Sequence, residues 1–154
     1  MESLVQSFLS NVVALCLRRR GRFPRAIREK FGRWAEKLAE AFDSSGLASA
    51  VAAALEKLRE SQSPLAGVLE AELSAVVALQ DYALEKPQGP DAIQAGEPDA
   101  TSRTRARAQD LSRALSASKS LLGSLQEILK DLPIWAKGLL KVGEELIEIY
   151  GPAR

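Results

Sequence analysis

The spacing of apolar residues between positions 111 and 132 constrains the fold of this chain more than any other feature. The apolar side chains recur there in alternating steps of four and three residues, which places them along one face of a helix. Ala114, Leu121 and Ile128 widen this row into a broad stripe. A stripe of this width needs another helix to cover it, either in the same chain or in a partner. The row itself consists of Leu111, Leu115, Ser118, Leu122, Leu125, Leu129 and Leu132.

A second amphipathic helix is predicted after a sharp corner at residues 130–133. Asp131 is a residue type that caps helices, and Pro133 is tolerated in a first turn because its missing N–H would have no intrahelical acceptor there. Core packing is the simpler interpretation of both stripes. The alternative is that one of them stays open to a partner helix or to a membrane surface. The second stripe consists of Trp135, Leu139, Val142, Leu146 and Ile149, flanked by Ile134, Leu140 and Ile147.

Four further amphipathic helices are predicted before residue 86. The first covers residues 2–20, the second follows Pro24 and ends within residues 43–46, and the third and fourth cover residues 47–58 and 64–85. Gly46 is a typical residue after a helix end, and Ser63 followed by Pro64 is a typical pair at a helix start. Residues 86–102 are rich in Pro and Gly, and we expect them to form one long flexible loop. The stripe of the second helix consists of Ile27, Phe31, Trp34, Leu38 and Phe42.

The composition favours helices over sheets. Hydrophobic residues make up 46% of the chain but aromatic residues only 5%, whereas strands usually draw on β-branched and aromatic side chains. A chain of 154 residues can bury one core without disulfides or structural metals. We therefore expect an all-α fold, namely a single compact bundle of five to six mostly antiparallel amphipathic helices that forms one domain over residues 1–154.

The residue types that carry most catalytic and metal-binding chemistry are scarce. The chain has no His, which removes the commonest general base and metal ligand. Cys16 is the only cysteine, and its place on the apolar face of the first helix favours a small buried hydrophobe over a reactive thiol. Glu56 and Glu60 lie one turn apart, but Lys57 and Arg59 beside them favour a solvated face over a metal site. We expect no enzyme, no cofactor and no metal, and, without disulfides, a cytoplasmic location.

Charge is distributed unevenly along the chain although the net charge is only +1. Residues 1–30 hold seven Lys and Arg against two Asp and Glu, whereas residues 31–100 hold five against twelve. Guanidinium groups bind phosphates and carboxylates bidentately, so arginine clusters are candidate contacts for a phosphate or an acidic partner. The alternative is that they are solvated and offset helix dipoles and the acidic middle segment. These candidates are Arg18, Arg19, Arg20, Arg22, Arg25, Arg28, Arg103 and Arg107.

Three non-catalytic functions fit these features. The first is a helical assembly or adaptor subunit that binds another protein, or a second copy of itself, through an apolar helix face. The second is a small helical subunit of a ribonucleoprotein complex that grips a nucleic-acid backbone without reading its sequence. The third is membrane association, which three glutamates in the last predicted helix disfavour because an anionic bilayer repels them. The interface candidates for the first function are Trp135, Leu139, Val142 and Leu146.

Overall fold

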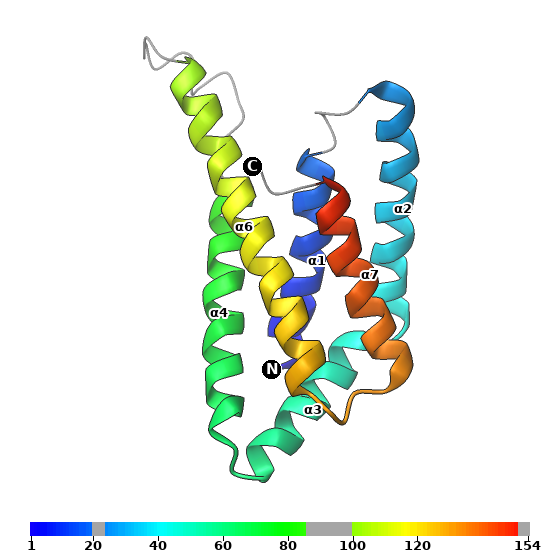
Figure 1. The fold of residues 1–154 in the computed structure, drawn as a ribbon, viewed down its shortest axis with the longest axis vertical. Coiled ribbons are helices and arrows are strands. Elements are labelled where there is room, and N and C mark those ends of the chain that lie inside the picture. The colour runs from blue at the N-terminus through cyan, green and yellow to red at the C-terminus, as the bar shows by residue number, and fades with distance from the viewer. Residues whose placement is uncertain (20–23, 86–99, 151–154) are drawn as a thin grey trace.

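The computed structural model describes residues 1–19, 24–85 and 100–150, and the side chains of residues 19, 85 and 100–108 lie outside this description. Every element in these ranges is an α-helix, and the helices pack side by side into an elongated bundle (Figure 1). The all-α helical bundle predicted from the sequence is therefore confirmed. The helices are α1 (Glu2–Arg19), α2 (Arg25–Ser44), α3 (Leu47–Glu60), α4 (Pro64–Glu85), α6 (Ala100–Ile128) and α7 (Ile134–Tyr150).

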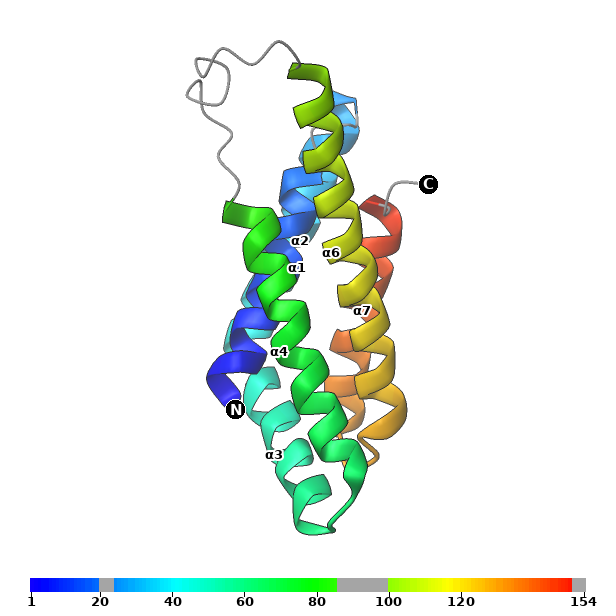
Figure 2. The same ribbon diagram turned by 90° about the vertical axis from the view of Figure 1, so that its left-hand side faces the viewer.

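Helix α1 is the centre of the bundle. It contacts each of the other five helices (Figures 1 and 2). Long helices that follow one another through short connections run in opposite directions, as α1 and α2 do, and α6 and α7 as well, while α3 runs obliquely near one end. Most of the wide apolar face of α1 is buried because neighbours surround it, and its buried side chains include Val5, Phe8, Leu9, Val12, Leu15 and Cys16.

The apolar row predicted between residues 111 and 132 belongs to the core. All seven of its side chains are buried, including Ser118. Helix α6 carries most of them and packs them against α4, α7 and α1. Leu129 and Leu132 follow the end of α6 and remain buried in the corner that leads to α7. The core interpretation of this stripe is confirmed, so α6 leaves no apolar row open to a partner along residues 111–128.

The predicted helix boundaries in the first half of the chain are confirmed at two corners. Gly46 adopts the left-handed conformation with φ of 76° between α2 and α3, where a residue without a Cβ carries little strain. Ser63 lies just before α4, and its hydroxyl oxygen accepts a hydrogen bond from the N–H of Leu65 at 3.3 Å. This bond satisfies one of the free N–H groups in the first turn.

Two boundaries in the second half differ from the prediction. α7 begins at Ile134, so Pro133 directly precedes the helix, and its carbonyl accepts hydrogen bonds from the N–H groups of Ala136 and Lys137, both at 3.1 Å. Helix α6 begins at Ala100, so residues 100–102 are helical although the loop was predicted to reach 102. The rest of the predicted loop, residues 86–99, lies outside the described residues.

One buried polar contact was not predicted from the sequence. Gln80 of α4 is completely buried, and its Nε2 donates hydrogen bonds to the carbonyl oxygen of Phe8 at 3.3 Å and to Oγ of Ser118 at 2.9 Å. The hydroxyl of Ser118 donates in turn to the carbonyl oxygen of Ala114 at 2.6 Å. This contact joins α1, α4 and α6 at one level of the core.

Candidate protein-binding groove

The stripe predicted for α7 is split between a buried and an exposed face. The buried face is formed by Ala136, Leu140, Gly143, Leu146, Ile147 and Tyr150. Val142 and Ile149 remain 46% and 36% exposed, and Trp135 is also exposed. The predicted stripe was therefore correct as an amphipathic helix but wrong in its centre, because the flanking Leu140 and Ile147 point into the core more fully than Val142 does.

Helix α2 also leaves apolar surface uncovered. Its buried residues are Gly32, Ala35, Leu38 and Phe42, whereas Trp34 is 51% exposed and Ile27 is exposed as well. Trp34 lies seven residues after Ile27, which places the two side chains on the same side of the helix. The row Trp135, Val142 and Ile149 on α7 has the same spacing.

Three residues of these rows, Trp34, Val142 and Ile149, line an open groove between α2 and α7. The groove has a volume of ≈ 480 Å³ and is mainly apolar. Its α2 wall consists of Trp34, Lys37, Leu38 and Ala41, and its α7 wall consists of Leu139, Val142, Glu145, Leu146 and Ile149. The groove is a candidate binding site because it offers a concave apolar surface with few charged groups at its edges.

Two contacts set the register of the α2 and α7 walls. A Cβ placed on Gly143 would lie 3.4 Å from Cζ of Phe42, and the ring centroids of Phe31 and Tyr150 lie 5.7 Å apart. The helices run in opposite directions (Figure 1), so the residues between these contacts pair in reverse order. The two contacts differ in register by about one helical turn, and they place Lys37 within about one turn of Glu145 on the facing wall.

Lys37 and Glu145 are the charged residues of the groove lining. Both side chains are exposed. Within the described residues no ion pair joins either of them to another group. The groove thus carries one cation on one wall and one anion on the other, within about one helical turn of each other, and both can meet charges on a bound molecule.

The four predicted interface residues are not equivalent in the structure. Leu139, Val142 and Leu146 line the groove, whereas Trp135 lies outside its lining. Leu146 is buried and Leu139 packs against the core, so Val142 is the most accessible of the three lining residues. Sequence reasoning missed the α2 wall, although the predicted row through Trp34 and Leu38 was broad enough to have both a core side and a groove side.

The arginine candidates fall at one end of the bundle, as far as they are described. Arg18 is the next-to-last residue of α1, while Arg25 and Arg28 belong to the first turn of α2, and both helix ends lie at the top of Figure 1. Arg18 and Arg25 are exposed and Arg28 is partly buried. Arg25 forms an ion pair with Glu29 at 3.4 Å. Positions 103 and 107 lie in the first turns of α6 at the same end, and the side chains of Arg19, Arg20, Arg22, Arg103 and Arg107 lie outside the described residues.

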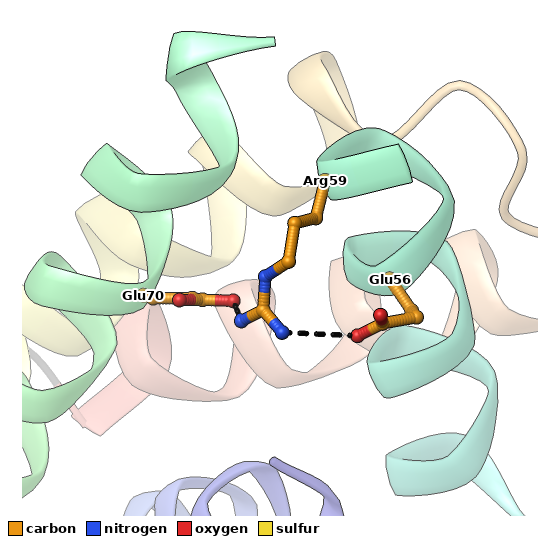
Figure 3. A network of polar contacts seen from close by, with 3 residues as sticks. All are labelled: Glu56, Arg59 and Glu70. Carbon is orange, nitrogen blue, oxygen red and sulfur yellow. Dashed lines mark hydrogen bonds and ion pairs between the residues drawn. The ribbon is translucent and has the colours of Figure 1, made fainter. Parts of the chain in front are cut away.

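The acidic residues Glu56 and Glu70 pair with Arg59 and not with the arginine candidates described above. Arg59 near the end of α3 lies between them, with Nη1 at 3.2 Å from Oε2 of Glu56 and Nη2 paired with Oε1 of Glu70 on α4 (Figure 3). This network is at the opposite end of the bundle from Arg18 and Arg25. The glutamates therefore do not neutralise those arginines by direct contact.

Other chemistry is sparse in the part of the chain that the structure describes. No group of three or more His, Cys, Asp or Glu side chains could hold a metal ion within these residues. Burial raises the pKa of the Cys16 thiol to about 12, so it stays protonated and unreactive at neutral pH. None of the described helices combines the length and the apolar character that crossing a bilayer requires.

Comparisons with known proteins found no matching protein-family model, no matching curated protein and no matching solved structure.

Proposed function

We propose that this chain is a non-catalytic helical subunit that binds another protein chain through the groove between α2 and α7. The observation that carries the proposal is the set of half-exposed apolar side chains beside a preformed groove, namely Trp34, Val142 and Ile149. Completing the burial of such side chains contributes about 1 kcal/mol each, roughly half the value for full burial. Three of them around one concavity supply a useful fraction of a binding free energy.

An α-helix suits this groove better than an extended peptide. The walls are two antiparallel helices whose exposed rows repeat every seven residues, from Ile27 to Trp34 and from Trp135 through Val142 to Ile149. Apolar side chains of an added helix can interdigitate with rows of this period. An extended peptide needs a free backbone edge to bond with, whereas the interior of a helix has already used its backbone hydrogen bonds.

Replacement of Val142 by lysine is the sharpest test of the groove. The side chain is 46% exposed, so the change is expected to leave the fold intact while it introduces an ammonium group into the apolar lining. We expect the Kd for the bound chain to rise about 30-fold or more, which corresponds to about 2 kcal/mol. Leu139→Lys is less suitable because Leu139 packs against the core, so loss of binding could reflect unfolding.

Val68→Lys is the matched control for this test. Val68 is 58% exposed on α4, outside the groove, and the chemical change is the same. In the first step, a photoreactive residue at position 142 or 68 is cross-linked to the bound chain, which is identified from the cross-linked peptide. In the second step, that chain is purified and its Kd for each of the two lysine variants is measured. Equal affinities of the Val142→Lys and Val68→Lys variants would contradict the proposal, as would cross-linking at 68 alone.

A second candidate function rests on the arginine end of the bundle. Arg18 and Arg25 lie at the end where α6 also begins, far from the glutamates that pair with Arg59 (Figures 1 and 3). We propose, as the alternative function, contact with a nucleic-acid phosphate backbone without sequence readout. The charge at this end supports it, whereas the near-neutral net charge of +1 makes it the weaker of the two. Membrane association has no comparable support, because exposed Glu145 and Glu148 lie on the same helix as Trp135.

The salt dependence of single-stranded nucleic-acid binding tests the phosphate contact. In the Arg18→Gln/Arg25→Gln double variant, we expect the slope of log K against log salt to become shallower by about 1.4, since each lost phosphate contact on a single strand removes about 0.7. The control variant Lys57→Gln/Lys130→Gln removes two exposed charges at the other end of the bundle and should keep the original slope. Salt-independent binding, or equal slopes in both variants, would eliminate this function.

A further inference from the structure

We infer that the chain that occupies the groove is a second copy of this protein, related to the first by a twofold axis that runs parallel to α2 and α7. The inference rests on the proposed function and specifies its partner. It is carried by the charges of the groove, because their opposite signs on facing walls make the surface complementary to itself.

The register of the walls determines how two copies can meet. The Phe42–Gly143 and Phe31–Tyr150 contacts place Lys37 on α2 and Glu145 on α7 within about one turn of each other across the groove. A twofold axis parallel to the helices keeps the level of every residue and exchanges the two walls. Lys37 of each copy then faces Glu145 of the other, which forms two equivalent ion pairs across the interface.

The other in-plane orientation of the axis is disfavoured by the same charges. An axis perpendicular to the helices would place α2 against α2 and α7 against α7 of the second copy. If this axis crosses the helices at the level of the two charges, Lys37 meets Lys37 and Glu145 meets Glu145. Juxtaposition of like charges in an interface is strongly unfavourable, so the charges favour the parallel axis over this arrangement.

The apolar residues obey the same symmetry. Trp34 and Ile149 line opposite walls of the groove, and both lie between the Phe31–Tyr150 contact and the pair of charges. Under the parallel axis, the half-exposed Trp34 of one copy covers the half-exposed Ile149 of the other, and this contact also occurs twice. A foreign helix would have to supply a matching acid, base and apolar surface, whereas a second copy already has all three in register.

Sedimentation equilibrium of the purified chain over a wide concentration range tests the inference. We expect the wild-type chain to show a monomer–dimer equilibrium. Lys37→Glu and Glu145→Lys are each expected to raise the dimer Kd at least about tenfold, because each change places two like-charged pairs in the interface. The Lys37→Glu/Glu145→Lys double variant restores opposite charges and is expected to regain the wild-type Kd within a few-fold. Both side chains are exposed, and thermal unfolding of each variant controls for stability.

Mixing the two single variants gives a second, independent readout. The Lys37→Glu copy carries two acids at this face and the Glu145→Lys copy carries two bases, so an equimolar mixture is expected to form heterodimers that neither variant forms alone. A wild-type chain that stays monomeric, single variants that dimerise as well as the wild type, or a double variant that does not recover would each overturn the inference. If the pure chain is monomeric while position 142 cross-links to a different protein, self-association is wrong and the proposed function stands. If position 142 captures nothing, both fail.

Discussion

Replacement of Phe42 by alanine is expected to lower the free energy of unfolding by about 3–5 kcal/mol. Phe42 is buried near the C-terminal end of α2, and its ring lies against Gly143 of α7, where an added Cβ would be 3.4 Å from Cζ. Gly143 has no side chain that could move into the space left by the ring. The cavity would therefore persist, and persistent cavities give the larger losses in this range. Urea denaturation followed by far-ultraviolet circular dichroism measures the change.

Trp34→Ala is the matched control on the same helix. Trp34 is the larger aromatic residue but is 51% exposed, so its removal opens no closed cavity and is expected to lower the unfolding free energy by only about 1 kcal/mol. The same variant should weaken dimerisation, because Trp34 lines the groove. Similar stability losses in the two variants would show that α2 does not have separate core and groove faces.

The sequence predicted the helices well because the chain is strongly periodic. The row from Leu111 to Leu132 is buried at every position, and Ser63 with Pro64 marks the start of α4 as expected. These features depend on residues that are neighbours along one helix, which a single sequence displays directly. The expected single bundle follows from the same periodicity together with short connections.

The groove could be predicted only in part. Leu139, Val142 and Leu146 were chosen because they belong to one stripe of the last helix, and they do form part of one wall. The second wall depends on how far α2 is rotated against α7, and that rotation is determined by the Phe42–Gly143 and Phe31–Tyr150 contacts. A stripe indicates that a helix needs a neighbour, but it does not show which of its edges the neighbour leaves uncovered.

The pairing of charges could not be predicted from sequence distance. Arg59 bridges Glu56 on its own helix and Glu70 on the next (Figure 3), and the second contact depends on the angle between α3 and α4. The hydrogen bonds of Gln80 were not predicted because they too depend on how separate helices pack against one another. The position of Gln80 in a largely apolar helix gave no sign that Phe8 and Ser118 would supply hydrogen-bond acceptors from two other helices.

Gln80→Glu is expected to destabilise the protein by about 3–5 kcal/mol at neutral pH, because it leaves an uncompensated charge in the core. Nε2 of Gln80 donates to the carbonyl oxygen of Phe8 and to Oγ of Ser118, whereas an ionised carboxylate has no proton to donate. Burial raises the pKa of a carboxyl group above its unfolded value. The part of the loss due to the charge should therefore vanish below about pH 4, where both states are protonated. It should grow as the pH rises from the unfolded pKa to the folded pKa and level off above that. A pH series of urea denaturations checks this sign, and a loss that does not change with pH would contradict it.

Gln80→Leu separates the need for an amide from the cost of a charge. Oε1 of Gln80 is buried without a hydrogen-bond partner in the described part of the chain, and leucine removes this unsatisfied oxygen while it fills a similar volume. The hydroxyl of Ser118 keeps its hydrogen bond to the carbonyl oxygen of Ala114, so no buried donor is left free there. We expect the leucine variant to be at least as stable as the wild type, with a gain of about 1 kcal/mol. If it is, the two amide hydrogen bonds of Gln80 add no net stability to the fold. A loss comparable to that of the glutamate variant would instead make the two amide hydrogen bonds a main source of stability.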